Sequence, residues 1–247
     1  MVSIITVCFN VEDTIEKTMR SVLDQTYKDL EYIIIDGSSH DRTIDIVNNV
    51  IKSYPNRTIH YISEPDNGLY DAMNKGILLS NGEWIGIMNS GDYYPSEKSL
   101  EDFFSNPKDF VGKDVVYGNA IEVSNGINRR WRGDPNHQKL ELHPTYRHGA
   151  SFVRASVHKQ NLFRIEKKEF SFALDYDNIF RMYKAGKTFH FIDKDILIYK
   201  KEGISNQRWK GIFLIFYITS QYGNLLKPTL WLLRSLAVQP LKNLLNR

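Results

Sequence analysis

The 247-residue sequence contains a single cysteine, Cys8, and lacks several patterns that mark common protein classes. One cysteine excludes a disulfide framework and a cysteine-rich zinc cluster, and it fits a reducing compartment. The chain contains neither G-x-G-x-x-G nor G-x-x-x-x-G-K-S/T, which disfavours a dinucleotide-binding fingerprint and a P-loop. The function must therefore be sought in other motifs.

Signals that direct a chain to or through a membrane are also missing from the sequence. The N-terminus has no basic region followed by an apolar stretch and a cleavage site, so we expect no signal peptide. There is no run of about 18 apolar residues, the length that suggests a membrane-spanning helix. We expect a cytoplasmic protein, with peripheral contact to the inner face of the cell membrane left open.

Short apolar runs alternate with helical patterns over about the first ninety residues. The predicted strands are residues 2–9, 30–35, 59–62 and 84–88. Between them, apolar residues recur at helical spacing within residues 15–23, 44–51 and 73–78. Such alternation with short loops is typical of βαβ units, so the sequence predicts an α/β fold with helices on both faces of a sheet.

The fourth apolar run ends abruptly in small and polar residues, Asn89, Ser90, Gly91 and Asp92. A carboxylate on a tight turn suits a hard divalent cation that is held by one or two carboxylates and by substrate phosphates. An ordinary turn is the alternative, because Ser-Gly-Asp is common turn chemistry. Asp92 is therefore a candidate metal ligand.

Polar residues also follow the other predicted strands, at 6–10, 36–41 and 65–68. The carboxyl ends of parallel strands share one edge of a sheet, which is where open α/β sheets bind ligands. A mononucleotide fits such an edge. Asp36 could accept a hydrogen bond from a base or a ribose hydroxyl, or it could be a plain helix-entry carboxylate.

Four ordered segments, residues 4–7, 34–43, 64–76 and 89–92, resemble family 2 glycosyltransferases with the GT-A fold. The resemblance implies a Rossmann-like nucleotide-binding mixed sheet flanked by helices. It also implies inverting transfer of one sugar from a nucleotide-sugar, for which we expect a UDP-sugar, to a glycan or a lipid-linked acceptor. Mg²⁺ or Mn²⁺ is the expected cofactor.

The same resemblance assigns residues to the donor. Thr6, Phe9 and Asn10 would flank the base, and Asp36 would bind the base or ribose. The other donor-site candidates are Ser38, Asp41, Asn67, Lys75 and Asn89. Lys75 would face the diphosphate as a mobile point charge, although a solvated helix lysine is the alternative.

The metal motif of this family is commonly Asp-x-Asp or Asp-Asp. Here Gly91 and Asn89 stand where acidic residues often occur, so Asp92 would be the main protein ligand.

In the second half, a helix is predicted whose first turn contains Asp175 and Asp177. Carboxylates are favoured there by the helix dipole, so simple capping is the alternative to catalysis. By the resemblance, Asp175 aligns with the Asp of a Glu-Asp motif that acts as general base, and Leu174 replaces the Glu. Asp177 ranks second.

His148 is expected to orient the acceptor or the leaving phosphate, like Asp177. A zinc site at His143 and His148 is disfavoured because no third ligand of suitable spacing is apparent. Other second-half expectations are a strand at 115–118, a hairpin around 124–126, a basic cluster at 129–132, and two short strands at 188–192 and 196–199.

The chain is predicted to contain a GT-A domain at 1–206 and a basic, amphipathic helical tail at 207–247. Within the domain, residues 1–95 would bind the nucleotide-sugar and 96–206 would bind the acceptor. The last 48 residues contain eight Lys/Arg and one acidic residue, a net charge of +7, whereas the whole chain carries +3. Basic residues beside Trp and Leu suit an anionic membrane surface; packing on the body or in a homodimer is the alternative.

Two other functions remain open. A nucleotidyltransferase could share a nucleotide-binding α/β half, but it would normally have a glycine-rich, basic loop where residues 8–12 stand. A non-catalytic nucleotide-sugar-binding module would fit the missing second metal acid. We expect no nucleic-acid partner.

Overall fold

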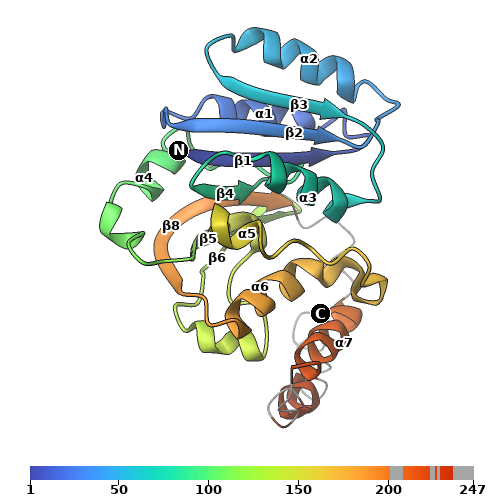
Figure 1. Ribbon diagram of the computed structural model, residues 1–247, viewed down its shortest axis with the longest axis vertical. Helices are drawn as coiled ribbons and strands as arrows, with labels where there is room; N and C mark the ends of the chain where they lie inside the picture. The colour runs from blue at the N-terminus through green and yellow to red at the C-terminus, as the bar shows by residue number, and fades with distance from the viewer. Residues whose placement is uncertain (201–207, 223–225, 227–228, 236–247) are drawn as a thin grey trace.

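The computed structural model describes the whole chain except residues 201–207, 223–225, 227–228 and 236–247 (Figure 1). Its centre is a mixed sheet in the order β3-β2-β1-β4-β7-β5-β6, with β8 paired to β5 outside this path. Helices cover both faces of the sheet, as the sequence predicts. The predicted boundary between residues 206 and 207 lies outside the described residues.

The parallel half of the sheet carries the predicted nucleotide-binding motifs. The strands are β1 (Val2–Cys8), β2 (Leu30–Asp36), β3 (Thr58–Ser63) and β4 (Trp84–Ile87), and each neighbouring pair is parallel. The connecting helices are α1 (Ile15–Leu23), α2 (Thr43–Ser53) and α3 (Leu69–Leu79). The predicted strands and helices of this half are thus confirmed.

Alternate residues of these strands enter two separate hydrophobic clusters. Ile4 packs on the face that α1 and α2 cover, whereas Ile5 packs on the face that α3 covers. This is the period-two alternation of a strand, applied to a sheet that is buried on both sides. Burial on both faces explains why these strands are almost uninterrupted runs of apolar residues.

The second half of the sheet is largely antiparallel. β7 (Ser151–Arg154) lies between β4 and β5 (Val115–Ser124), antiparallel to both, and β5 forms a hairpin with β6 (Ile127–Trp131). The hairpin turn is the predicted one. Its residues Asn125 and Gly126 have φ of 50° and 76°, as a type I′ turn requires.

One expectation about the second half is corrected. The two short strands predicted at 188–192 and 196–199 form a single strand, β8 (Phe189–Lys200), which is parallel to β5 with a register irregularity. The polar stretch that suggested a break includes Asp193 and Asp195. Both pair with Arg130 of β6 at 3.1 and 2.6 Å, so the strand continues through them.

These ion pairs involve two arginines of the basic cluster predicted at 129–132. Arg132 reaches Asp193 at 3.1 Å, so both Arg130 and Arg132 are paired on the sheet edge.

The remaining helices lie around the antiparallel half. The catalytic candidate Asp175 lies in the first turn of α6 (Leu174–Lys184), which follows the 3₁₀ helix η4 (Lys168–Ala173). The shorter helices are α4 (Ser99–Phe103), η1 (Pro107–Asp109), η2 (His137–Glu141), η3 (His148–Ala150) and α5 (Ala155–His158).

The described part of the tail begins with α7 (Arg208–Ser220), which projects beyond α6 at one end of the molecule (Figure 1). Leu214 and Ile218 of α7 are buried in the same cluster as α6. Phe213 and Tyr217 are 50% and 42% exposed, so α7 is apolar on both sides and not amphipathic. Among the described residues, no helix is long and apolar enough to cross a membrane.

Candidate functional site

A cleft of about 650 Å³ opens at the carboxyl ends of β1, β2 and β4. Of the predicted donor residues, Phe9 and Asn89 line it. The rest of its lining comes from Val7, Cys8, Val11, Gly37, Pro65, Asp66, Gly68, Leu69, Ala72 and Ser90. Its walls therefore come from all four resembling segments and from positions within residues 8–11.

Two cleft residues, Asp66 and Phe9, lie close to the backbone of Gly37. A Cβ on Gly37 would lie 2.6 Å from a carboxylate oxygen of Asp66 and 3.4 Å from the ring of Phe9. The Phe9 ring is 56% exposed, so a flat face is available for stacking against a base. The sequence prediction omitted Asp66, although it belongs to the 64–76 segment.

Asp36 lies at the end of β2 and is fully buried. Its carboxylate accepts hydrogen bonds from the Ser39 amide at 3.0 Å and the Ser63 hydroxyl at 2.6 Å, and from the Ser39 hydroxyl. The Cys8 thiol is a further neighbour, at 3.7 Å. Burial and the Asp36 charge raise the pKa of Cys8, so this cysteine stays a neutral thiol.

The loops after β1 and β2 hold each other through polar side chains. Asn10 accepts a hydrogen bond from the His40 amide at 2.8 Å, and Asp41 accepts from the amides of Glu12 and Thr43 at 3.1 and 2.9 Å. Asn10 and Ser38 adopt positive φ, 51° and 62°. Both predicted residues, with Asp41, thus shape the two loops.

Thr6 lies beneath these loops and is fully buried. Its hydroxyl accepts a hydrogen bond from Tyr32 at 2.8 Å. Thr6 and Asp36 are buried and do not line the cleft, whereas Phe9 and Asn89 do.

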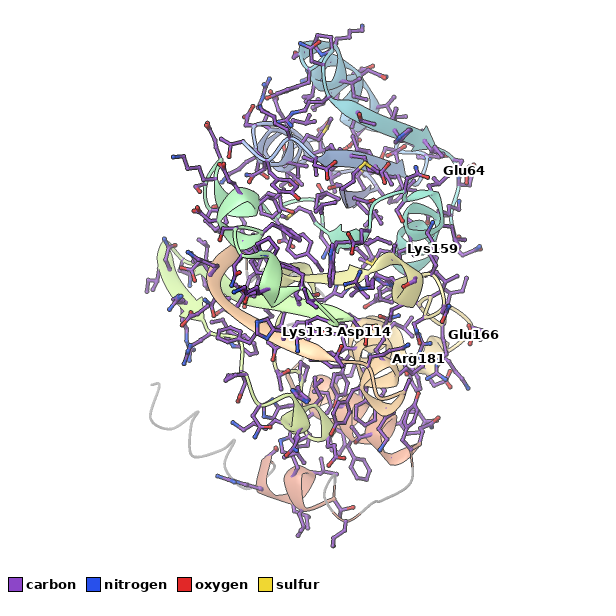
Figure 2. All side chains as sticks on the ribbon, turned by 60° about the vertical axis from the view of Figure 1, so that its left-hand side comes forward. Glu64, Lys113, Asp114, Lys159, Glu166 and Arg181 are labelled. Carbon is purple, nitrogen blue, oxygen red and sulfur yellow. The ribbon has the colours of Figure 1, made fainter. Side chains whose placement is uncertain are left out.

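Lys75 and Asn67 lie beside the loop that joins β3 to α3. Lys75 Nζ is 2.7 Å from a Glu64 carboxylate oxygen and 2.9 Å from the Pro65 carbonyl oxygen. Figure 2 shows Glu64 at the end of β3. The Asn67 backbone and side-chain amides both donate to Asp71, at 2.9 and 3.2 Å. In this arrangement Lys75 is neutralised by Glu64, and neither Lys75 nor Asn67 lines the cleft.

The turn after β4 contains the side chains of Asn89 and Asp92, which offer oxygen atoms to a ligand. Within the described part of the chain, Asn89 Oδ1 is buried without a hydrogen bond, and the Asp92 carboxylate makes no bond. Burial raises the pKa of Asp92 to about 7. Gly91 has φ of 95°, a conformation that glycine adopts readily. The Gly91 amide donates a hydrogen bond to the Thr18 hydroxyl oxygen at 2.9 Å.

This turn fits a divalent cation that takes its other ligands from a bound phosphate. Hard cations prefer oxygen ligands, and Mg²⁺ often uses one or two carboxylates with substrate phosphates. Within the described residues, no group of three His, Cys, Asp or Glu could hold a metal by itself. Asp92 is therefore the protein carboxylate available to such an ion, with Asn89 beside it.

Asp175 in the first turn of α6 and His148 in η3 affect each other's pKa. Burial raises the pKa of Asp175, while the charges of His148 and Arg147 oppose that rise, and the Tyr176 amide donates to its carboxylate at 2.7 Å. Burial lowers the pKa of His148, and Asp175 opposes this. Each group therefore shifts the pKa of the other toward its charged form, while burial acts in the opposite direction on both.

Asp177 occupies a different environment from Asp175. It is fully buried and forms ion pairs with Arg164 and Arg181, with Nε–Oδ2 distances of 3.0 and 3.2 Å. Arg181 points from α6 (Figure 2) and also donates to the Leu162 carbonyl oxygen. Both oxygens of Asp177, the second acceptor-side candidate, are thus bonded to arginines, one of which belongs to the loop before α6.

The sequence prediction missed three residues that connect separate segments. Tyr70 of α3 packs on the ring of Phe163 at a centroid distance of 5.1 Å, and Asn74 of α3 forms two hydrogen bonds with the Phe163 backbone. The Arg147 guanidinium lies over the rings of Trp131 and Tyr199, at 4.7 and 5.1 Å from their centroids. Tyr70 and Asn74 lie within the 64–76 segment. Their partners are far away in the sequence, so no local pattern indicates their role.

Residues 3–195 match the family model described as Glycosyl transferase family 2. The chain belongs to this family. The match covers the cleft, the turn of Asn89 and Asp92, and the base candidate Asp175. The matched residues thus include both the parallel and the antiparallel half of the sheet, apart from the first residue of β1 and the last residues of β8.

Relatives of family 2 share sequence with this chain over part of their length. A PGL/p-HBAD biosynthesis glycosyltransferase of Mycobacterium bovis is 32% identical over 157 residues, which are 64% of this chain and 60% of the relative. The Escherichia coli UDP-Glc:alpha-D-GlcNAc-diphosphoundecaprenol beta-1,3-glucosyltransferase WfaP is 35% identical over 137 residues, which are 52% and 53% of the two chains. These alignments span only about half to three fifths of the relatives.

A solved structure shows that the fold is GT-A. The mannosyltransferase PcManGT of Pyrobaculum calidifontis, in complex with GDP-Man and Mn²⁺, superposes with a TM-score of 0.69 at 16% identity. The superposition covers 94% of this chain and 69% of that one. The predicted family and fold class are both confirmed.

Proposed function

We propose that this protein is an inverting glycosyltransferase that moves one hexosyl group from a nucleotide-sugar, expected to be a UDP-sugar, to a glycan or lipid-linked acceptor in polysaccharide assembly. The observation that carries the proposal is the 650 Å³ cleft with the buried Asn89 Oδ1, unpartnered among the described residues, and the Asp92 carboxylate in the turn at its edge. The named activities of the family 2 relatives support the reaction class.

In this proposal the donor nucleotide lies in the cleft. The base stacks on Phe9, while Thr6, Asn10, Asp36, Ser38 and Asp41 hold the two loops that shape the pocket. Asn67 of the loop after β3 and Lys75 of α3 are the proposed residues of the diphosphate side, where the donor would compete with Glu64 for Lys75. Asp92, with Asn89 beside it, holds Mg²⁺ or Mn²⁺. When bound, the cation neutralises charge that develops on the leaving diphosphate.

Asp175 is the proposed general base. Transfer requires an acceptor hydroxyl to lose its proton as its oxygen forms a bond to the anomeric carbon, so a carboxylate within hydrogen-bond reach is needed. The bond from the anomeric carbon to the diphosphate oxygen breaks, and the proton moves to Asp175. A single in-line displacement inverts the anomeric configuration. His148 and, second to it, Asp177 are the proposed residues of the acceptor or phosphate side; Asp177 is ion-paired with Arg164 and Arg181.

A donor panel tests this proposal. The protein is incubated with UDP- and GDP-sugars and with lipid-diphosphate-linked sugars as acceptors, with Mn²⁺ or with EDTA. We expect Mn²⁺-dependent transfer, and we expect Asp92→Asn to weaken donor binding by roughly tenfold or more, since a charged ligand is lost. Donor binding without transfer or hydrolysis would favour a non-catalytic module. Donor affinity that Asp92→Asn and EDTA leave unchanged would contradict the cation role.

The tail supports a second, separate part of the proposal, contact with an anionic membrane. Leu226, Leu230 and Leu233 are 65%, 58% and 58% exposed, and the last 48 residues carry a net charge of +7. Exposed apolar residues among basic ones are the composition of interfacial helices. Such contact would bring the enzyme to a lipid-linked acceptor.

Liposome flotation with the full chain tests the membrane contact. We expect flotation with vesicles of phosphatidylglycerol and not with phosphatidylcholine alone, and a loss of flotation for the double variant Leu230→Ser/Leu233→Ser. These side chains are exposed, so the fold should be unaffected. Wild-type flotation of the double variant would contradict the proposal. Self-association without flotation, measured by light scattering, would indicate a homodimer instead.

A further inference from the structure

A cluster of aromatic and charged side chains lies on one face of the sheet, where β6 and β8 flank β5. Trp131 of β6 pairs with Ala120, and Tyr199 of β8 pairs with Glu122. Ala120 and Glu122 are two positions apart on β5, so they share a face of the sheet. The two aromatic residues that pair with them therefore share this face with the Glu122 carboxylate.

The Arg147 guanidinium lies over both of these rings. Its carbon is 4.7 Å from the ring centroid of Trp131 and 5.1 Å from that of Tyr199, distances at which a ring face attracts a cation. The rings hold the positive charge in place, but they are not oxygen acceptors. The five N–H donors of an arginine still need such acceptors.

The acceptors near this guanidinium do not satisfy it. Arg147 Nε is buried and has no hydrogen-bond partner among the residues that the structure describes. Glu122 Oε2 is 3.9 Å from an Arg147 nitrogen, beyond hydrogen-bond distance, and it accepts a hydrogen bond from the Tyr199 hydroxyl at 2.8 Å. The Arg147 side chain is nevertheless 42% exposed. A ligand from solvent can therefore reach a guanidinium that the protein already holds in place.

The cluster is joined to the turn of the proposed metal ligand. Tyr93, the residue after Asp92, forms two backbone hydrogen bonds with Ile198, at 3.0 and 2.8 Å. Ile198 directly precedes Tyr199 in β8. The aromatic rings around Arg147 thus belong to a strand and a hairpin that border the reaction site.

The other neighbour of the cluster is the proposed base. Arg147 directly precedes His148 in the chain. Burial raises the pKa of Asp175, and the charge of Arg147 is one of those that oppose the rise. Arg147, Trp131 and Tyr199 are not among the residues that line the donor cleft. The guanidinium is therefore placed for the acceptor and not for the nucleotide.

We propose that Arg147, held over the rings of Trp131 and Tyr199, binds a phosphate group of the acceptor, so that the enzyme selects phosphate-bearing acceptors over neutral ones. This inference rests on the proposed function, because it takes the side of Asp175 as the acceptor side. Two phosphate oxygens match the guanidinium fork and supply the acceptor that Nε lacks. In a sugar diphosphate, the phosphate lies across the sugar ring from hydroxyl groups that can receive another sugar.

Kinetics with a matched pair of acceptors test the inference. One is an alkyl diphosphate of the sugar that the acceptor panel selects, and the other is the neutral glycoside of the same sugar and alkyl chain. We expect Arg147→Gln to raise KM for the diphosphate acceptor roughly tenfold or more, as for lost hydrogen bonds to a charged group. For the neutral acceptor, kcat/KM should stay within about twofold, as should the donor dissociation constant. Arg147→Lys keeps the charge without the fork and should recover part of the loss.

Arg132→Gln is the matched control. It removes the same charge from a guanidinium that also lies over a ring, that of Phe191 at 5.3 Å, but that is paired with Asp193 at 3.1 Å. Its KM for the diphosphate acceptor should match that of the wild type. An equal rise in both variants would show a general effect of charge and would overturn the inference. An equal loss of activity of Arg147→Gln toward both acceptors would show a structural role alone and would also overturn it.

Isothermal titration with decyl diphosphate gives a reading that needs no turnover. The protein is first saturated with UDP, so that the titrant does not report on the nucleotide site. We expect binding to the wild type and to Arg132→Gln, and roughly tenfold weaker binding to Arg147→Gln. If Arg147→Gln instead weakens donor binding and leaves decyl diphosphate binding unchanged, the phosphate belongs to the donor and the inference is wrong.

The two levels of the argument can fail separately. If transfer occurs and Arg147→Gln treats both acceptors as the wild type does, only the inference about Arg147 fails. If no acceptor receives sugar from any donor, the proposed function fails, and the titration with decyl diphosphate still decides whether Arg147 binds a phosphate.

Discussion

The side-chain amide of Asn74 pairs with both backbone groups of Phe163: Phe163 N–H donates to Oδ1 at 2.8 Å, and Nδ2 donates to the Phe163 carbonyl oxygen at 2.9 Å. Asn74 belongs to α3 in the donor half, whereas Phe163 belongs to the loop before α6. One amide thus satisfies two backbone groups across 89 residues of sequence. It fastens the helix beside the donor cleft to the region of the base.

Asn74→Ala should destabilise the protein, because it leaves the two backbone groups of Phe163 without partners. We expect the free energy of unfolding to fall by about 2 kcal/mol in urea titrations. Asn48→Ala is the control, since Asn48 is an exposed residue of α2 and alanine there should change stability by no more than about 0.7 kcal/mol. An equal effect of the two substitutions would show that the Asn74 amide contributes nothing.

Glu31 should make the folded state sensitive to acid. Burial alone would raise its pKa, but hydrogen bonds from Ser3, Asn81 and Gly82 outweigh burial and hold the pKa below its usual value of 4.5. A carboxyl group with a lowered folded pKa adds stability above its unfolded pKa, and this stability is lost as the pH falls through the folded pKa. The wild type should therefore lose stability on acidification below about pH 4.5.

Glu31→Gln removes this contribution. Its urea midpoint should be lower than that of the wild type at neutral pH, and the difference should shrink as the pH falls below 4.5. Measurements at several pH values, in the same buffer series, compare the two slopes. A constant difference at all pH values would mean that ionisation of Glu31 does not stabilise the fold.

The ion pair of Lys75 and Glu64, at 2.7 Å, allows two roles for the lysine to be distinguished. If Lys75 binds the donor diphosphate, Glu64 competes for it. Lys75→Gln should then weaken donor binding by roughly tenfold, while Glu64→Gln should tighten it by about twofold. If Lys75 only supports the loop at Pro65, both substitutions should weaken binding. Isothermal titration with the donor distinguishes the two results.

Much of the fold follows from local sequence patterns. The four parallel strands are continuous apolar runs because both faces are buried, and the hairpin turn requires the left-handed conformation that Asn125 and Gly126 adopt. The single strand β8 was not predictable in this way. Asp193 and Asp195 interrupt its apolar pattern, and their arginine partners on β6 lie more than 60 residues earlier.

The site was predictable where one segment contains both the polar residues and the strand that positions them. Asn89 and Asp92 follow a buried strand, so their place at the sheet edge follows from the pattern. The contact of Asn74 was not predictable, because its partner Phe163 lies 89 residues later. Asp175 and Asp177 lie in the same predicted first helical turn; the ion pairs of Asp177 with Arg164 and Arg181 appear only in the tertiary structure.

Turnover of Asp175→Asn tests the central claim most directly. Transfer rate and donor affinity are measured together, with Asp45→Asn, an exposed position in α2, as the matched control. We expect kcat to fall by about 10²–10⁴-fold, the usual contribution of a general base, while the donor dissociation constant changes by less than about twofold. Asp45→Asn should behave like the wild type. Near wild-type turnover by Asp175→Asn would contradict the account.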